Sequence, residues 1–213
     1  DHIDEVNELV LKDNSLKAIK TSDPALWTKE TYDIIKSQTR KTIGLGVIHR
    51  DTSKFMEKQR KLYKEIILMF ESRGLDWELF SNGEIADQDF AYELVQEMNF
   101  SKEKVVSRKK RPNELVNLIA SYNSMISFRL HSHIVATSLR VPSVGMTWDK
   151  KVDYFFETFN SEDRCFSVDS NSRDIVNKII EIDKCPLDPN DEVLSLAKEN
   201  LENILIKEVS KYI

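Results

Sequence analysis

The sequence predicts an α/β fold built on one parallel β-sheet. Three observations support this prediction. Between about residues 42 and 182, short apolar runs alternate with longer stretches whose apolar side chains recur at helical spacing. Such short apolar runs are typical of strands that helices cover on both faces of a sheet. The chain of 213 residues is long enough for one large domain of this kind.

Each element follows from its own local pattern. A first strand at 43–48 precedes a long helix, which carries Phe55, Leu62 and Ile66 at helical spacing and closes at Gly74. Later helices are expected at 87–98, from Pro112 onward, and at 131–139, 151–159 and 173–182. The remaining strands are expected at 77–80, 104–107, 124–128, 143–147 and 164–168. Six strands joined to helices by right-handed crossovers indicate a Rossmann-like, doubly wound sheet.

The two ends of the chain differ from this middle part. Residues 1–40 show no clear alternation and start with Asp1 instead of Met, so we interpret them as the end of a larger unit. The Rossmann-like domain is expected at 41–188, and a C-terminal helix at 189–213. This helix either folds back on its own sheet or crosses to a missing partner domain, because it has an apolar stripe of Val193, Leu194, Ala197, Leu201, Ile204, Leu205 and Val209.

Composition excludes several classes of protein. With 40% apolar and 31% charged residues, the chain is not disordered, and no apolar run approaches the roughly 18 residues that cross a bilayer, so we expect a soluble protein. A net charge of −5 argues against a nucleic-acid partner. Only two cysteines, Cys165 and Cys185, are present, which favours a reducing compartment. A local basic cluster either is solvated or faces a phosphate-bearing substrate or an anionic membrane; it comprises Lys102, Lys104, Arg108, Lys109, Lys110 and Arg111.

Charged residues follow three of the expected strands. Doubly wound sheets bind ligands beyond the carboxyl ends of their strands. The first strand ends in His49 and Arg50, the fourth expected strand in residues 129–133, and the fifth runs into Trp148 and Lys151. These side chains are therefore the candidates for a ligand site.

Common cofactor motifs are absent. Gly44 and Gly46 lie inside the first strand with no third glycine after them, so the dinucleotide fingerprint is missing, and there is no P-loop. His131 and His133 are two residues apart, so they point to different sides of a helix. The sequence also offers no convincing third ligand that would complete a metal site with them. We therefore expect neither a metal nor an organic cofactor.

The segment after the fourth expected strand suits an anionic ligand. Arg129 can hold a carboxylate or phosphate through two hydrogen bonds, and His131 can exchange a proton near neutral pH. The helix that starts here offers backbone N–H groups, with Ser132 as a cap or hydroxyl donor. The alternative is that Arg129 pairs with a nearby carboxylate and that both histidines bond to backbone groups.

Residues 126–152, ISFRLHSHIVATSLRVPSVGMTWDKKV, resemble the signature of the polysaccharide pyruvyl transferase family. The shared pattern is an apolar strand, Arg-x-His, a helix with small residues, a turn, a second strand, and an aromatic residue shortly before Lys-Val. Residues 23–26 (DPAL) and 43–50, a strand that ends in Arg, resemble two further family segments. The resemblance runs from about residue 11 to residue 159. Arg140, where a Gly is usual, and Trp148, where a Tyr is common, depart from it.

This resemblance implies the carboxy-terminal half of a GT-B-like enzyme without its amino-terminal half. It makes residues 1–40 the expected segment that connects to the missing amino-terminal domain. Family members transfer a pyruvyl group from phosphoenolpyruvate to two sugar hydroxyls of a cell-surface or secreted polysaccharide and leave a cyclic ketal. The partners implied are phosphoenolpyruvate and a glycan or lipid-linked sugar, in the cytoplasm or at the inner face of the membrane. The resemblance carries over Arg129 and His131, from which we expect catalysis, and we expect substrate binding by Arg50, Ser132, His133 and Lys151. From the Arg-x-His spacing at a strand end, we hypothesise that His131 is the general acid.

Two other functions remain open from the sequence. A nucleotide-sugar glycosyltransferase of the same architecture would hold the diphosphate of its donor at the same strand ends. A non-catalytic family member would keep the fold alone, and the joint presence of Arg129, His131 and Lys151 argues against it. Binding of a nucleoside diphosphate instead of phosphoenolpyruvate would favour the glycosyltransferase.

Overall fold

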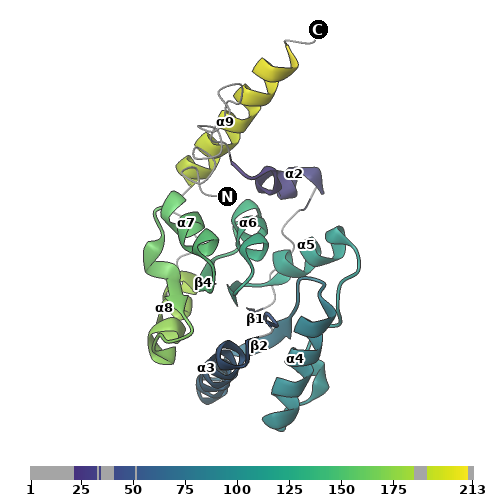
Figure 1. Ribbon diagram of the computed structural model, residues 1–213, viewed down its shortest axis with the longest axis vertical. Helices are drawn as coiled ribbons and strands as arrows, with labels where there is room; N and C mark the ends of the chain where they lie inside the picture. The colour runs from purple at the N-terminus through teal and green to yellow at the C-terminus, as the bar shows by residue number, and fades with distance from the viewer. Residues whose placement is uncertain (1–21, 33, 35–40, 51, 185–190, 211–213) are drawn as a thin grey trace.

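The computed structural model describes residues 22–32, 34, 41–50, 52–184 and 191–210. Its centre is a five-stranded parallel sheet with the strand order β2-β1-β3-β4-β5. The strands are β1 (Thr42–Gly46), β2 (Asp76–Phe80), β3 (Ser124–Ser127), β4 (Ser143–Thr147) and β5 (Cys165–Ser167). The predicted α/β, Rossmann-like fold is confirmed (Figure 1).

One expected strand is wrong. The run at 104–107 forms a single parallel bridge between Val105 and Leu79, preceded by the 3-10 helix η2 (Lys102–Lys104). Only two apolar residues, Val105 and Val106, are available here to lie against the edge strand β2 before the basic residues begin. The pairing therefore ends after Val106 donates its N–H to the carbonyl oxygen of Leu79 at 2.8 Å.

Helices cover both faces of the sheet. On one face, α3 (Ser53–Ser72), α4 (Ile85–Glu97) and α8 (Ser172–Lys184) bury apolar side chains in one core cluster. On the other face, α5 (Pro112–Ser121) and α6 (Leu130–Leu139) form a second cluster, and α7 (Lys150–Thr158) packs beside them on β4. Gly145 of β4 allows this close approach, because a Cβ atom there would overlap the ring of Phe156. The C-terminal half of α7 is thus held against the sheet.

The ends of the described chain pack together outside this sandwich. The short helices η1 (Pro24–Trp27) and α2 (Thr28–Thr31) lie against α6, and the first half of α9 (Asp191–Val209) contacts η1. Leu194, Ala197 and Leu201 are buried, whereas Leu205 and Val209 are more than half exposed, as α9 extends away from the domain (Figure 1). The predicted apolar stripe is therefore covered only in its first half. The 3-10 helix η3 (Glu162–Arg164) precedes β5.

Several expectations from the sequence fall partly outside the described residues. Of the segment 1–40, only residues 22–32 and 34 are described, and the boundary near residue 188 and Cys185 also lie outside. Cys165 is a free, partly buried thiol. In the part of the chain that is described, no helix is both long and apolar enough to cross a membrane.

Candidate functional site at the carboxyl edge of the sheet

The candidate site lies where the three central strands end. Strands β1, β3 and β4 are neighbours and run parallel, so the segments that follow them emerge at the same edge. The chain after β1 leads to Arg50, the chain after β3 to Arg129 and α6, and the chain after β4 to Trp148 and α7. The topology therefore brings together three segments that are far apart in the sequence.

Arg129 forms a two-pronged ion pair with a buried carboxylate. Its Nε and Nη2 atoms donate to both oxygens of Asp87 at 2.7–3.1 Å. The Arg129 side chain is 28% exposed, whereas that of Asp87 is 1% exposed. Oδ1 of Asp87 also accepts the backbone N–H of His49 at 2.7 Å. Burial raises the pKa of the Asp87 carboxyl, and the hydrogen bonds from His49 and Arg129 oppose this shift.

Asp87 is a site residue that sequence reasoning missed. It lies in the first turn of α4, on the same helix face as the buried Phe90, Ala91 and Leu94. An acidic residue on an apolar face near the carboxyl edge of a predicted sheet was the available signal. Pairing with a carboxylate was the alternative that the sequence left open for Arg129, and the structure shows it.

Arg50 is held by an aromatic ring. Its guanidinium carbon lies 4.0 Å from the ring centroid of Trp148, which corresponds to a cation-π contact. The indole N–H of Trp148 donates to the carbonyl oxygen of Phe128 at 2.8 Å. Because Phe128 directly precedes Arg129, this contact links the segment after β4 to the segment after β3. Arg50 and Arg129 therefore belong to one connected framework.

The two histidines of α6 have opposite environments. The His131 side chain is 72% exposed, and its Nε2 atom lies 4.0 Å from Oδ2 of Asp23, the residue that caps η1. The His133 ring is fully buried: Nε2 lies 2.9 Å from the carbonyl oxygen of Ser127, and Nδ1 lies 3.1 Å from Oγ of Ser143. A carbonyl only accepts, so Nε2 carries the proton. Burial lowers the pKa of His133 to about 4.

The remaining predicted site residues also include one that is buried, Ser132, and one that is exposed, Lys151. Ser132 is buried and donates its hydroxyl to Oδ1 of Asn82, two residues after the end of β2, at 2.8 Å, so it does not cap α6. Lys151 is exposed in the first turn of α7, whose N-cap is Asp149. The structure thus leaves Arg50, Arg129, His131 and Lys151 accessible at one edge, and it places Ser132 and His133 beneath them.

Much of the basic cluster is already engaged. Lys104 pairs with Asp76 at 3.0 Å, and Arg111 pairs with Glu114 at 2.9 Å. Arg108 donates to the carbonyl oxygen of Gly83 at 2.9 Å. Among the residues that the structure describes, no group of three or more His, Cys, Asp or Glu side chains is arranged to hold a metal ion.

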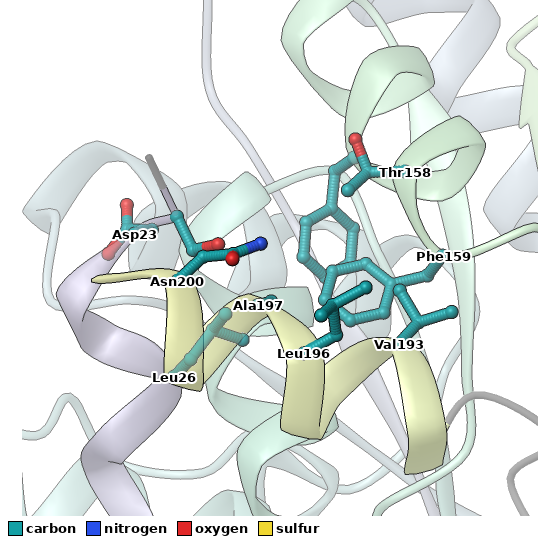
Figure 2. Close-up of a pocket in the computed structure, with 10 residues that line it drawn as sticks. Asp23, Leu26, Thr158, Phe159, Val193, Leu196, Ala197 and Asn200 are labelled. Carbon is teal, nitrogen blue, oxygen red and sulfur yellow. The ribbon is translucent and has the colours of Figure 1, made fainter. Parts of the chain in front are cut away.

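A separate cavity of about 420 Å³ lies between η1, α7 and α9. Its lining is mainly apolar, and Figure 2 shows Leu26, Phe159, Val193 and Leu196 facing the cavity, with Asp23 and Asn200 at its polar end. Asp23 is the residue that also approaches His131. The cavity therefore adjoins the exposed histidine but is formed by other elements than the strand ends.

The sequence comparison decides the family. Residues 6–150, more than half of the chain, match the family model described as polysaccharide pyruvyl transferase. The chain belongs to the polysaccharide pyruvyl transferase family. The matched region of this family member includes Arg50, Arg129 and His131, and it ends one residue before Lys151. No curated protein sequence matches the chain significantly.

Solved structures share the fold of this pyruvyl transferase family member. The UDP-GlcNAc 2-epimerase of Methanocaldococcus jannaschii, in complex with UDP-GlcNAc and UDP, gives a TM-score of 0.56 at 13% identity, over 95% of this chain and 59% of that one. A putative UDP-N-acetylglucosamine 2-epimerase from Listeria monocytogenes gives 0.53 at 13% identity, over 91% and 50%. The S. aureus MnaA-UDP structure gives 0.52 at 12% identity, over 92% and 50%. At these identities the likeness shows the GT-B-like fold alone, and the chain spans 50–59% of their lengths.

Proposed function

We propose that this chain is the donor-binding half of an enzyme that transfers a pyruvyl group from phosphoenolpyruvate to two hydroxyls of a polysaccharide sugar. The observation that carries the proposal is the joint framework of Arg50 and Arg129 beside the exposed His131, at one sheet edge of a family member. Two guanidinium groups suit a small ligand with two anionic groups.

Phosphoenolpyruvate carries a carboxylate and a phosphate on one three-carbon unit. Arg129 and Arg50 bind these two groups, and Lys151 at the start of α7 adds a third positive charge. The first turn of α6, which contains no acidic residue, adds the favourable end of a helix dipole. With both anionic groups held, the enol carbons lie next to the acceptor side of the site.

His131 supplies the proton for the reaction. In protonated form it donates to the methylene carbon, or alternatively to the departing phosphate, and Arg129 stabilises the anionic groups around an oxocarbenium-like centre at the neighbouring carbon. One sugar hydroxyl adds to that carbon, the C–O bond to phosphate breaks, and the second hydroxyl closes the ketal. When His131 protonates the methylene carbon, one of the two hydroxyl protons returns to His131 and the other leaves on phosphate. When His131 protonates the phosphate, one hydroxyl proton goes to the methylene carbon and the other returns to His131. The products are the ketal and inorganic phosphate.

The acceptor side of the enzyme is expected beyond this chain. This proposal is supported by the length of the chain, which covers only 50–59% of the solved structures that share its fold. A glycan or lipid-linked sugar would bind between this half and an amino-terminal half, in the cytoplasm or at the inner face of the membrane. No metal ion or organic cofactor is needed for the steps above.

A nucleotide-sugar donor is the second candidate. The observation that favours it is the fold shared with enzymes whose structures contain UDP. In that case Arg129 and the start of α6 would bind a diphosphate, and phosphoenolpyruvate would not compete for it.

Turnover by the complete enzyme tests the proposal. Phosphorus NMR would follow the release of inorganic phosphate from phosphoenolpyruvate, and proton NMR would follow the new ketal methyl group. We expect His131→Gln to lower turnover about 100-fold or more. Arg73→Ala is a suitable control, because Arg73 bonds to Asn177 at the opposite edge of the sheet. Wild-type turnover in His131→Gln would contradict the assigned role.

A further inference from the structure

The guanidinium group of Arg129 has two usable edges. Asp87 occupies the edge formed by Nε and Nη2. Within the described part of the chain, Nη1 of Arg129 donates to no protein atom, and the side chain keeps 28% of its surface exposed. The edge that contains Nη1 is therefore the one left for a ligand.

We propose that Asp87 is the positioning residue of the anion site, which it prepares by fixing two separate segments at once. It holds Arg129 so that the Nη1 edge faces the ligand. Through its bond to the backbone N–H of His49, it also fixes the end of the β1 segment, directly before Arg50. This inference rests on the proposed function, in which Arg129 and Arg50 bind the anionic groups of the donor.

Free arginine side chains sample many rotamers, and binding a ligand to one of them costs conformational entropy. The Asp87 carboxylate limits this cost in advance, because it bonds to Arg129 in a fixed plane and is itself 1% exposed. Its backbone is held in the first turn of α4, whose buried face anchors that helix in the core. The position of the ligand-binding edge is thus set by the sheet and not by a mobile loop.

Asp87 also sets the charge balance of the site. It neutralises one of the two arginines, so Arg129 contributes directed hydrogen bonds more than net charge. The attraction for a multiply charged donor then falls mainly on Arg50 and Lys151. If charge attraction alone determined binding, removal of the negative charge of Asp87 beside the anion site would strengthen the binding of the donor. A positioning role predicts the opposite result, weaker binding.

Asp87→Asn tests the inference, with phosphoenolpyruvate as the probe in calorimetric titrations of this chain. The amide keeps an oxygen for the His49 N–H but cannot accept two bonds from Arg129. We expect the dissociation constant for phosphoenolpyruvate to rise about tenfold, which corresponds to the loss of one preorganised side chain. The Nε–H resonance of Arg129 in ¹⁵N NMR is expected to lose its protection from exchange. Asp87→Glu keeps both oxygens and the charge, and it is expected to restore part of the affinity.

Asp76→Asn is the matched control. Asp76 is also an ion-paired aspartate, bonded to Lys104 and Thr42, but it lies at the start of β2, at the opposite edge of the sheet. It is expected to leave phosphoenolpyruvate affinity unchanged. Unchanged or tighter binding by folded Asp87→Asn would overturn the positioning role while the proposed donor stands. If Asp87→Asn does not fold, full wild-type affinity in Asp87→Glu together with an unprotected Arg129 resonance would overturn it. No binding by the wild-type chain would instead contradict the proposed donor, and the inference with it.

Discussion

The acid dependence of folding gives a quantitative test of the role of His133. The buried imidazole stays neutral in the folded state, with its pKa lowered from 6.5 to about 4. In the unfolded chain the same group takes up a proton near pH 6.5, so protons favour unfolding between pH 6.5 and 4. A difference of roughly 2.5 pKa units at about 1.4 kcal/mol each corresponds to between about 3 and 4 kcal/mol in full, of which about 3 kcal/mol is lost by pH 4. Stability from this residue is thus complete above pH 6.5 and is lost as the pH falls to 4.

Urea unfolding of the wild-type chain and of His133→Gln, at several pH values from 7 to 4, would measure this contribution. Gln keeps an Nε2 donor for the carbonyl oxygen of Ser127 but does not titrate. We expect the stability advantage of the wild type to shrink by about 3 kcal/mol across the range. The carboxylates of Glu30, Asp76 and Glu114, with lowered pKa values, affect both proteins equally. Parallel pH profiles would refute a buried, neutral His133.

Three further predictions follow from the same structure. Trp148→Ala removes the ring that holds Arg50, so phosphoenolpyruvate binding should weaken about 2- to 30-fold in calorimetry. Trp148→Phe should keep most of the affinity, and equal losses in both variants would contradict the cation-π contact. Gly145→Ala places a methyl group against Phe156 and should cost about 1–3 kcal/mol in urea unfolding, and an unchanged midpoint would show that α7 adjusts freely. Burial and the nearby Asp153 raise the pKa of the Cys165 thiol to about 12. In a Cys185→Ser variant, mass spectrometry should therefore show that Cys165 reacts with iodoacetamide at pH 8 far more slowly than glutathione does. A comparable rate would contradict the burial of this thiol.

The sequence predicted the sheet well because its strands are locally encoded. Strands β1 to β5 lie within two residues of the expected runs, since each is a short apolar segment between recognisable helices. The strand predicted at 104–107 was wrong because a local sequence pattern does not show how many residues can pair with an edge strand. Its pairing depends on β2, which is distant in the sequence, and only Val105 and Val106 take part.

The candidate site was predictable in its exposed part and not in its buried part. The spacing of His131 and His133 predicted that they point to different sides of α6, but not which one the core would take. The ion pair of Arg129 with Asp87 joins residues 42 positions apart, and it depends on where α4 packs over the strand ends. Such a contact follows from topology, so local propensity alone does not show it.

The central claim is that this sheet edge binds phosphoenolpyruvate through Arg129. The most direct measurement is a calorimetric titration of the chain with phosphoenolpyruvate and, separately, with UDP, repeated on Arg129→Ala and on the Arg73→Ala control. The account predicts binding of phosphoenolpyruvate that is lost in Arg129→Ala and kept in Arg73→Ala. Binding of UDP without phosphoenolpyruvate, or phosphoenolpyruvate binding that survives Arg129→Ala, would contradict it.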